Sequence, residues 1–163
     1  MNTKQIPGLQ AHTGGWQRRH WLALAALVSL SPLTAWAAGS VNLNAQGIAL
    51  HGHDPVAYFV DGRPVKGTAE FNAKSKSAVY WFANAANLQA FQANPERYEP
   101  QYGGYCAFGV AQGFKPDIDP NAFAIVDGKL YLNLSPGVQK RWQADIPGYI
   151  TQATTNWATL KDQ

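Results

Sequence analysis

The chain has 163 residues, a length that favours one domain, and a formal net charge of +3 from 13 basic and 10 acidic residues. Lys4, Arg18 and Arg19 lie near the N-terminus, and the ten other basic residues balance the ten acidic ones. The rest of the chain therefore lacks the basic stripe of a nucleic-acid-binding protein, and its single cysteine excludes an internal disulfide.

Residues 1–37 have the pattern of a secretory signal peptide. Arg18 and Arg19 precede an apolar run over residues 21–30, and the sequence "AWA" before Ala38 is typical of a cleavage site. The paired arginines also resemble a twin-arginine signal, so both export routes and an uncleaved signal anchor stay open. We expect export to the periplasm, cleavage near Ala37 and no stable membrane span afterwards, because the apolar run is too short.

The first half of the mature chain predicts short strands and then a helix. Apolar, β-branched and aromatic runs predict strands, with a turn at "DGRP"; the strand ranges are 48–50, 56–60, 65–71 and 78–83. Asn84 is a typical cap for a helix over residues 85–94, and "PERYEP" predicts a further short helical turn.

The second half predicts a loop, a hairpin and two helices. A glycine-rich loop at 103–113 precedes strands at 121–126 and 130–134, which "DGK" joins. Ser135 and Pro136 start one helix, and another begins near Pro147. Since strands and helices come in groups, we expect an α+β fold in which small antiparallel hairpins pack with about three helices. Residues 38–163 then form a single domain with a C-terminal helical extension.

The sequence lacks the motifs of the common enzyme and cofactor-binding classes. No phosphate-binding glycine loop, zinc-protease motif, nucleophile elbow, haem attachment motif or C-x-x-C pair is present. The "DID" sequence at 117–119 lacks the spaced oxygen ligands of a calcium loop. The absence of these motifs therefore leaves the sequence without support for an enzymatic function.

Residues 81–98 resemble the YHS domain family. The matching positions are Phe82, Phe91, Asn94, Pro95, Glu96 and Tyr98. "DPVAYF" at 54–59 resembles the family's opening, while "PQYGGYCA" and "DGKLYLN" resemble a secreted subgroup, so that the likeness covers roughly residues 41–157. The resemblance implies metal-binding cysteines at positions 57, 83 and 87, but this chain has Ala57, Ala83 and Asn87. Metal binding at those positions therefore does not follow from the family.

Three other residues can ligate a soft transition metal: His51, His53 and Cys106. On an extended chain the two histidines of "HGHD" point to the same side, and a thiolate beside them would suit copper or zinc. Asp54 could orient an imidazole, with Tyr102 and Tyr105 also near the site. The alternative for the histidines is a solvated loop. Four aromatic residues either line a pocket for a small aromatic ligand or belong to the core: Tyr102, Tyr105, Phe108 and Phe114.

Cys106 has three alternative roles. Its neighbours Tyr105, Ala107 and Phe108 favour a packed thiol, and the absence of a lysine or arginine within eight residues disfavours a reactive thiolate. It could also ligate a metal, or act as a nucleophile if a histidine served as its base.

We expect an exported, non-catalytic module that binds a small ligand or a metal ion, with copper as the first choice and zinc as the second. Two other functions stay open: an envelope domain that binds another protein without metal, and a Cys-His thiol-dependent enzyme.

Overall fold

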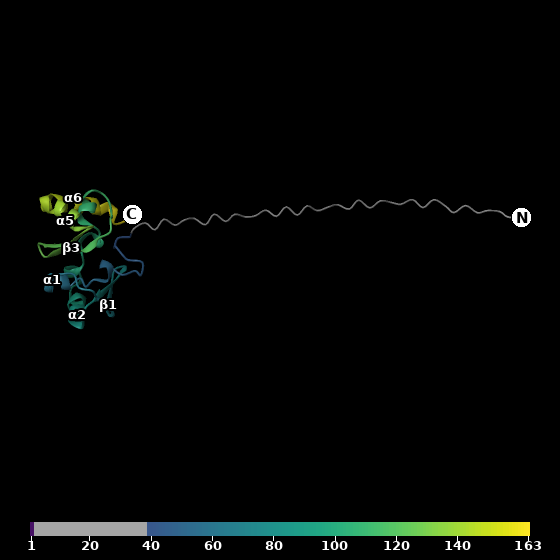
Figure 1. Cartoon of the computed structure of the whole chain (residues 1–163), viewed down its shortest axis with the longest axis horizontal. Coiled ribbons are helices and arrows are strands. Elements are labelled where there is room, and N and C mark those ends of the chain that lie inside the picture. Colours follow the sequence, from purple (N-terminus) through teal and green to yellow (C-terminus); the bar gives the residue numbers. More distant parts are fainter. Residues whose placement is uncertain (2–38) are drawn as a thin grey trace. The chain divides into compact units, whose positions relative to one another are not determined.

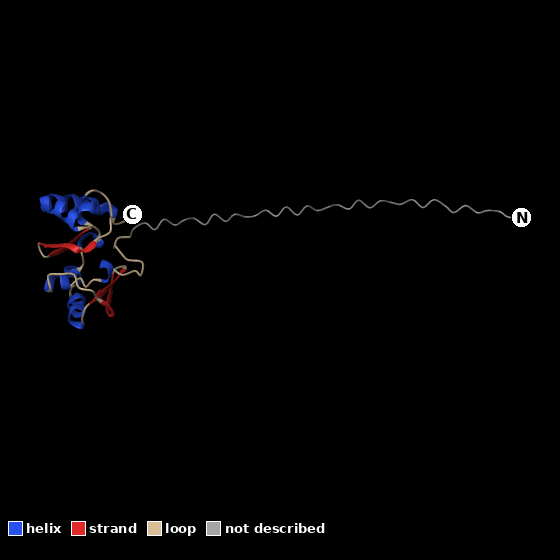
Figure 2. Ribbon diagram, in the orientation of Figure 1, coloured by secondary structure: helices blue, strands red, loops and turns tan. Residues whose placement is uncertain are grey.

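The structure is a computed structural model that describes Met1 and residues 39–163. The predicted signal peptide over residues 1–37 thus lies almost entirely outside the described residues. Residues 39–163 fall within one contact unit, Ala35–Gln163. Figures 1 and 2 show its helices and strands.

The first half of this unit contains a hairpin and several short helices. In chain order its elements are η1 (Leu50–Gly52), α1 (Ala57–Val60), β1 (Thr68–Ser75), β2 (Ala78–Phe82), α2 (Ala85–Ala93) and α3 (Pro95–Tyr98). Strands β1 and β2 pair antiparallel, with a register shift between Thr68 and Asn72. Asn84 caps α2 as predicted, because its side chain accepts a hydrogen bond from the Asn87 N–H at 2.9 Å.

The second half contains the other hairpin and the longest helix. Its elements are η2 (Gln101–Gly104), α4 (Ala107–Ala111), β3 (Asp119–Val126), β4 (Lys129–Asn133), α5 (Pro136–Trp142), η3 (Gln143–Asp145) and α6 (Ile146–Leu160). Strands β3 and β4 also pair antiparallel. The predicted hairpin, the Ser135 cap and the last two helices are confirmed, and so is the α+β class.

Three local predictions are wrong. Residues 57–60 form helix α1 instead of a strand, because Asp54 accepts hydrogen bonds from the N–H groups of Val56 and Ala57 and starts the helix. The glycine-rich loop at 103–113 contains α4, and Leu50 leaves the extended conformation at φ +53°. The described residues hold more helical segments than the expected three or so, since several are single turns.

Strand β4 lies between two hydrophobic clusters. Leu130 and Leu132 belong to one cluster with Phe82 and Phe91, whereas Tyr131 belongs to the other with the fully buried Trp142. Alternate residues of a strand point to opposite faces, so β4 supplies both clusters. Burying an aromatic side chain of this kind stabilises the fold by roughly 4–6 kcal/mol.

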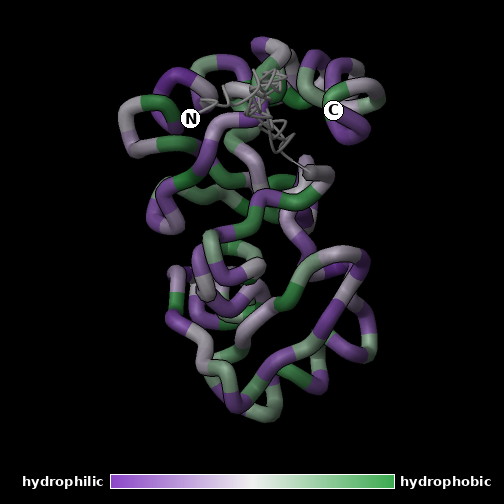
Figure 3. Tube along the Cα trace, turned by 90° about the vertical axis from the view of Figure 1, so that its right-hand side faces the viewer, coloured by the Kyte–Doolittle hydropathy of each residue, from purple (hydrophilic) through white to green (hydrophobic). Residues whose placement is uncertain are grey.

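Hydrophilic and hydrophobic residues are interspersed along the trace of the described residues (Figure 3). Within residues 39–163, none of the helices combines the length and the apolar character needed to cross a membrane.

Candidate functional site

The segment that carries both histidines forms a left-handed turn. Leu50, His51 and Gly52 have φ angles of +53°, +52° and +76°. A left-handed conformation costs a residue with a side chain roughly 1–2 kcal/mol, so packing must hold this turn in place. The prediction of an extended segment is therefore wrong, and the argument from it that both imidazoles point to one side no longer applies.

The two histidines have different partners. His51 Nε2 lies 2.8 Å from Asp117 Oδ1, and His53 Nδ1 lies 3.0 Å from the carbonyl oxygen of Leu50. Burial lowers the pKa of His53, and the hydrogen bond to Leu50 only partly opposes this effect. His53 therefore favours its neutral form.

Asp117 is the anion that holds His51. Burial alone would raise its pKa, but hydrogen bonds from the Asn42 side chain, the Ile118 N–H and His51 outweigh burial and lower the pKa. Asn42 Nδ2 donates to the same Asp117 oxygen at 2.9 Å. The carboxylate thus joins the left-handed turn to the loop that follows α4.

Asp54 holds the other end of this segment. It has no exposed surface, and four donors approach its carboxylate. Oδ1 accepts from the N–H groups of Val56 and Ala57, and Oδ2 accepts from the Ala83 N–H at 2.9 Å and from Asn87 Nδ2 at 2.7 Å. None of these four donors is an imidazole, so the bonds do not support the predicted role of Asp54 in orienting a histidine. Positions 57, 83 and 87, where the family resemblance implied cysteines, instead surround one carboxylate.

Cys106 is a packed thiol, only 1% exposed, at the N-terminus of α4. Its Sγ accepts a hydrogen bond from the Gly109 N–H at 3.4 Å and lies 3.8 Å from Asn133 Oδ1. Burial raises the pKa of the thiol, against smaller opposing effects of hydrogen bonds from the backbone of Gly109, Leu134 and Phe108. Of the three roles left open by the sequence, this environment favours the structural one.

The described part of the chain, residues 39–163, contains no group of three or more His, Cys, Asp or Glu side chains that could hold a metal ion. A metal shared by the three residues would bind the ring nitrogens that the contacts with Asp117 and Leu50 leave open, His51 Nδ1 and His53 Nε2, and Cys106 would have to give up its contact with Asn133. Copper or zinc binding by these three residues stays a prediction.

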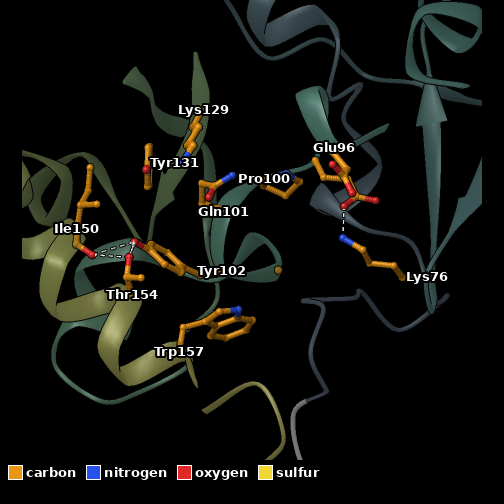
Figure 4. A pocket seen from close by; sticks show the side chains of 12 residues that line it. Lys76, Glu96, Pro100, Gln101, Tyr102, Lys129, Tyr131, Ile150, Thr154 and Trp157 are labelled. Atoms are coloured by element: carbon orange, nitrogen blue, oxygen red, sulfur yellow. Dashed lines mark hydrogen bonds and ion pairs between the residues drawn. The ribbon is translucent and has the colours of Figure 1, made fainter. Parts of the chain in front are cut away.

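A cavity of about 410 Å³ opens elsewhere in the same unit, between η2, β4 and α6. Figure 4 shows it from close by, with Tyr102, Tyr131 and Trp157 on one side and Glu96 and Lys76 on the other. We call it the aromatic groove. Besides these five residues, its lining consists of Glu99, Pro100, Gln101, Gly103, Lys129, Ile150 and Thr154. Its volume falls in the range typical of small-molecule sites.

The backbone at η2 places Tyr102 in the groove. Tyr102 and Gly103 are both left-handed, at φ +53° and +59°, and a Cβ on Gly103 would lie 1.9 Å from the Ser40 carbonyl oxygen. Only glycine fits such an approach. The Tyr102 hydroxyl donates to the Ile150 carbonyl at 3.2 Å and lies equally close to Thr154 Oγ1, which fixes η2 on α6. The "YGGY" sequence therefore forms the left-handed turn that places Tyr102 against α6.

The polar groups of the groove fall into two sets. Glu99 is 8% exposed and forms an ion pair with Lys76 while accepting from the Ser75 hydroxyl. By contrast, within residues 39–163 the side chains of Glu96, Gln101 and Lys129 make no hydrogen bond or ion pair. These uncommitted groups are available to a ligand.

Tyr131 contributes a hydroxyl to this second set. Burial, followed by the nearby Tyr102 and Asp127, raises the pKa of Tyr131 to about 12. The phenol therefore keeps its proton at neutral pH, and no described residue accepts that proton in a hydrogen bond.

Sequence reasoning found only part of this site. Tyr102 lines the groove, which agrees with the alternative of a pocket residue and not with a place near a metal, while the Tyr105 hydroxyl donates to the Gly39 carbonyl at 2.9 Å. The sequence predicts Lys129 in the turn between two strands and Trp157 on the apolar period of the last helix, so neither is a predicted site residue. The observed strand starts at Lys129, one residue before the predicted strand over 130–134, and a strand with this start would have placed the side chains of Lys129 and Tyr131 on one face.

Comparisons with models of protein families, with curated proteins and with solved structures found no match to this chain. The resemblance to the YHS family therefore stays a prediction.

Proposed function

We propose that this protein is an exported binding module that holds a small polar organic ligand in the aromatic groove and does not transform it. Export is proposed from the signal-like pattern of residues 1–37. Binding is proposed from the groove, where fixed aromatic rings lie beside polar side chains without protein partners. This combination is typical of small-molecule sites, in which apolar surface supplies affinity and a few polar groups supply orientation.

The fixed framework supports binding over catalysis. Tyr102 is hydrogen-bonded to α6, and the Lys76–Glu99 pair neutralises two charges on the opposite wall. The one thiol of the chain, Cys106, is buried and does not line the groove. What the groove presents is a preorganised set of recognition groups, which lowers the entropic cost of binding.

Native mass spectrometry tests this proposal. Protein purified from the compartment to which cells export it should carry a small organic molecule, which denaturation releases. Trp157→Phe, which keeps an aromatic ring but removes the indole, should reduce the bound fraction. Trp81→Phe is the matched control, because Trp81 lies on β2 and does not line the groove. Equal retention in both variants, or ligand-free protein throughout, would refute binding in the groove.

A further inference from the structure

We infer that the ligand of the aromatic groove carries a carboxylate on a ring with an apolar face, and that Lys129 and the Tyr131 hydroxyl bind the carboxylate. This inference rests on the proposed function and adds the chemical class of the ligand. It starts from two side chains on β4 that line the groove together. They are two residues apart on one strand and so share a face.

Lys129 and Tyr131 offer hydrogen-bond donors without acceptors of their own among the described residues. The Lys129 ammonium is exposed and has no ion pair there, and the Tyr131 hydroxyl has no hydrogen-bond acceptor. Asp127, in the adjoining turn, is the acidic residue that contributes to the raised pKa of Tyr131. It is exposed and does not line the groove. An ionised carboxylate only accepts hydrogen bonds, and such charge-assisted bonds are stronger than neutral ones.

The other side chains of the groove favour a ring for the body of the ligand. Trp157 is half-buried, with its ring 6.1 Å from that of Tyr102, and it lines both this cavity and an adjoining one of about 360 Å³. A partly accessible indole offers a flat apolar surface to a ring. A bare phosphate has no apolar face to place there.

The charges favour a single negative charge. The Lys76 ammonium is paired with Glu99, so Lys129 is the lysine of this cavity that has no ion pair within residues 39–163. Glu96 on the opposite side is uncommitted and would repel a second anionic group. A monoanionic ring compound matches one free cation better than a polyanion does.

Aromatic carboxylates and sugar acids share this chemistry, so the experiment uses one pair of probes from each class. Protein purified from cells that express the full chain is titrated by calorimetry with benzoate and benzamide, and with glucuronate and glucose. We expect one of the two acids to bind at least about tenfold more tightly than its neutral counterpart, the range expected for a charge-assisted hydrogen bond. The acid that binds identifies the source of the ring.

Variants assign the effect to these residues. Lys129→Gln should abolish the preference for the acid, and Tyr131→Phe should reduce it. Lys140→Gln should leave it unchanged, because Lys140 is an exposed lysine on α5 away from the groove. A preference that survives Lys129→Gln overturns the inference. Equal binding of acid and neutral compound, or no binding of any probe, also overturns it. In both cases the retained mass in native spectrometry still decides the proposed function separately.

Discussion

Asp54→Asn is a direct test of what holds the segment that carries His51 and His53. The carboxylate is fully buried and accepts hydrogen bonds from two donors on each oxygen. An asparagine has the same shape but replaces one oxygen with an NH2 group. In either orientation that NH2 faces two donors, either the N–H groups of Val56 and Ala57 or those of Ala83 and Asn87.

The substitution therefore removes two hydrogen bonds to a charged acceptor and leaves donors opposed to donors. Hydrogen bonds to charged groups contribute about 1.5–3 kcal/mol each, so we expect a loss of about 3–5 kcal/mol in the free energy of unfolding. A loss of this size is a large share of the free energy of unfolding of a whole domain, which is roughly 5–15 kcal/mol.

Urea denaturation followed by tryptophan fluorescence measures this loss. Asp61→Asn is the matched control, because Asp61 is exposed at the C-terminus of α1 and makes no side-chain hydrogen bond within the described residues. We expect it to change stability by less than about 0.5 kcal/mol. If Asp54→Asn costs less than about 1 kcal/mol, the reasoning from unpaired buried donors is refuted.

Three further predictions concern other parts of the chain. At pH 7, iodoacetamide should label Cys106 at least about tenfold more slowly in native protein than in urea, because burial raises the pKa of the thiol. Equal labelling rates would contradict the packed environment of Cys106. The exported form should begin at Ala38 by intact mass, and replacing Arg18 and Arg19 together by lysine should block export only on the twin-arginine route. Asp117→Asn should lower the free energy of unfolding by about 0.5–1 kcal/mol at pH 7. This loss should vanish as pH falls below about 4, because a carboxylate whose pKa is lowered in the folded state stabilises the fold only while it is ionised. A loss that persists at pH 2 would contradict this assignment.

Rules that act within a few residues predicted much of the fold. The caps at Asn84 and Ser135 and the "DGK" turn each depend on local hydrogen bonds or backbone preferences, and all three are confirmed. The error at 57–60 has the opposite cause. Its β-branched and aromatic residues favour a strand, but a buried carboxylate at Asp54 stabilises the first turn of a helix, and tertiary context overrides propensity.

The geometry of the histidine segment was beyond the reach of pattern reasoning. Leu50 and His51 are left-handed although neither is glycine, and a contact distant in sequence, between His51 and Asp117, helps to hold them. The aromatic groove likewise depends on contacts between residues that are distant in the sequence. Lys129 and Trp157 are 28 positions apart, and their proximity depends on η2, which packs against both β4 and α6.

Copper binding by His51, His53 and Cys106 has a structural cost and a testable signature. His51 contacts Asp117 at 2.8 Å through Nε2, so it would ligate through Nδ1 with the carboxylate orienting its ring, whereas the buried Cys106 would have to give up its contact with Asn133 and lose its proton. If copper is bound there, Asp117→Ala should lower the affinity for Cu(I) by about tenfold or more, because it removes the carboxylate that orients His51, and Cys106→Ala with His53→Ala should lower it further. An anaerobic titration against a competing chelator measures all three proteins. Equal affinities in the three proteins would end the case for copper at these residues.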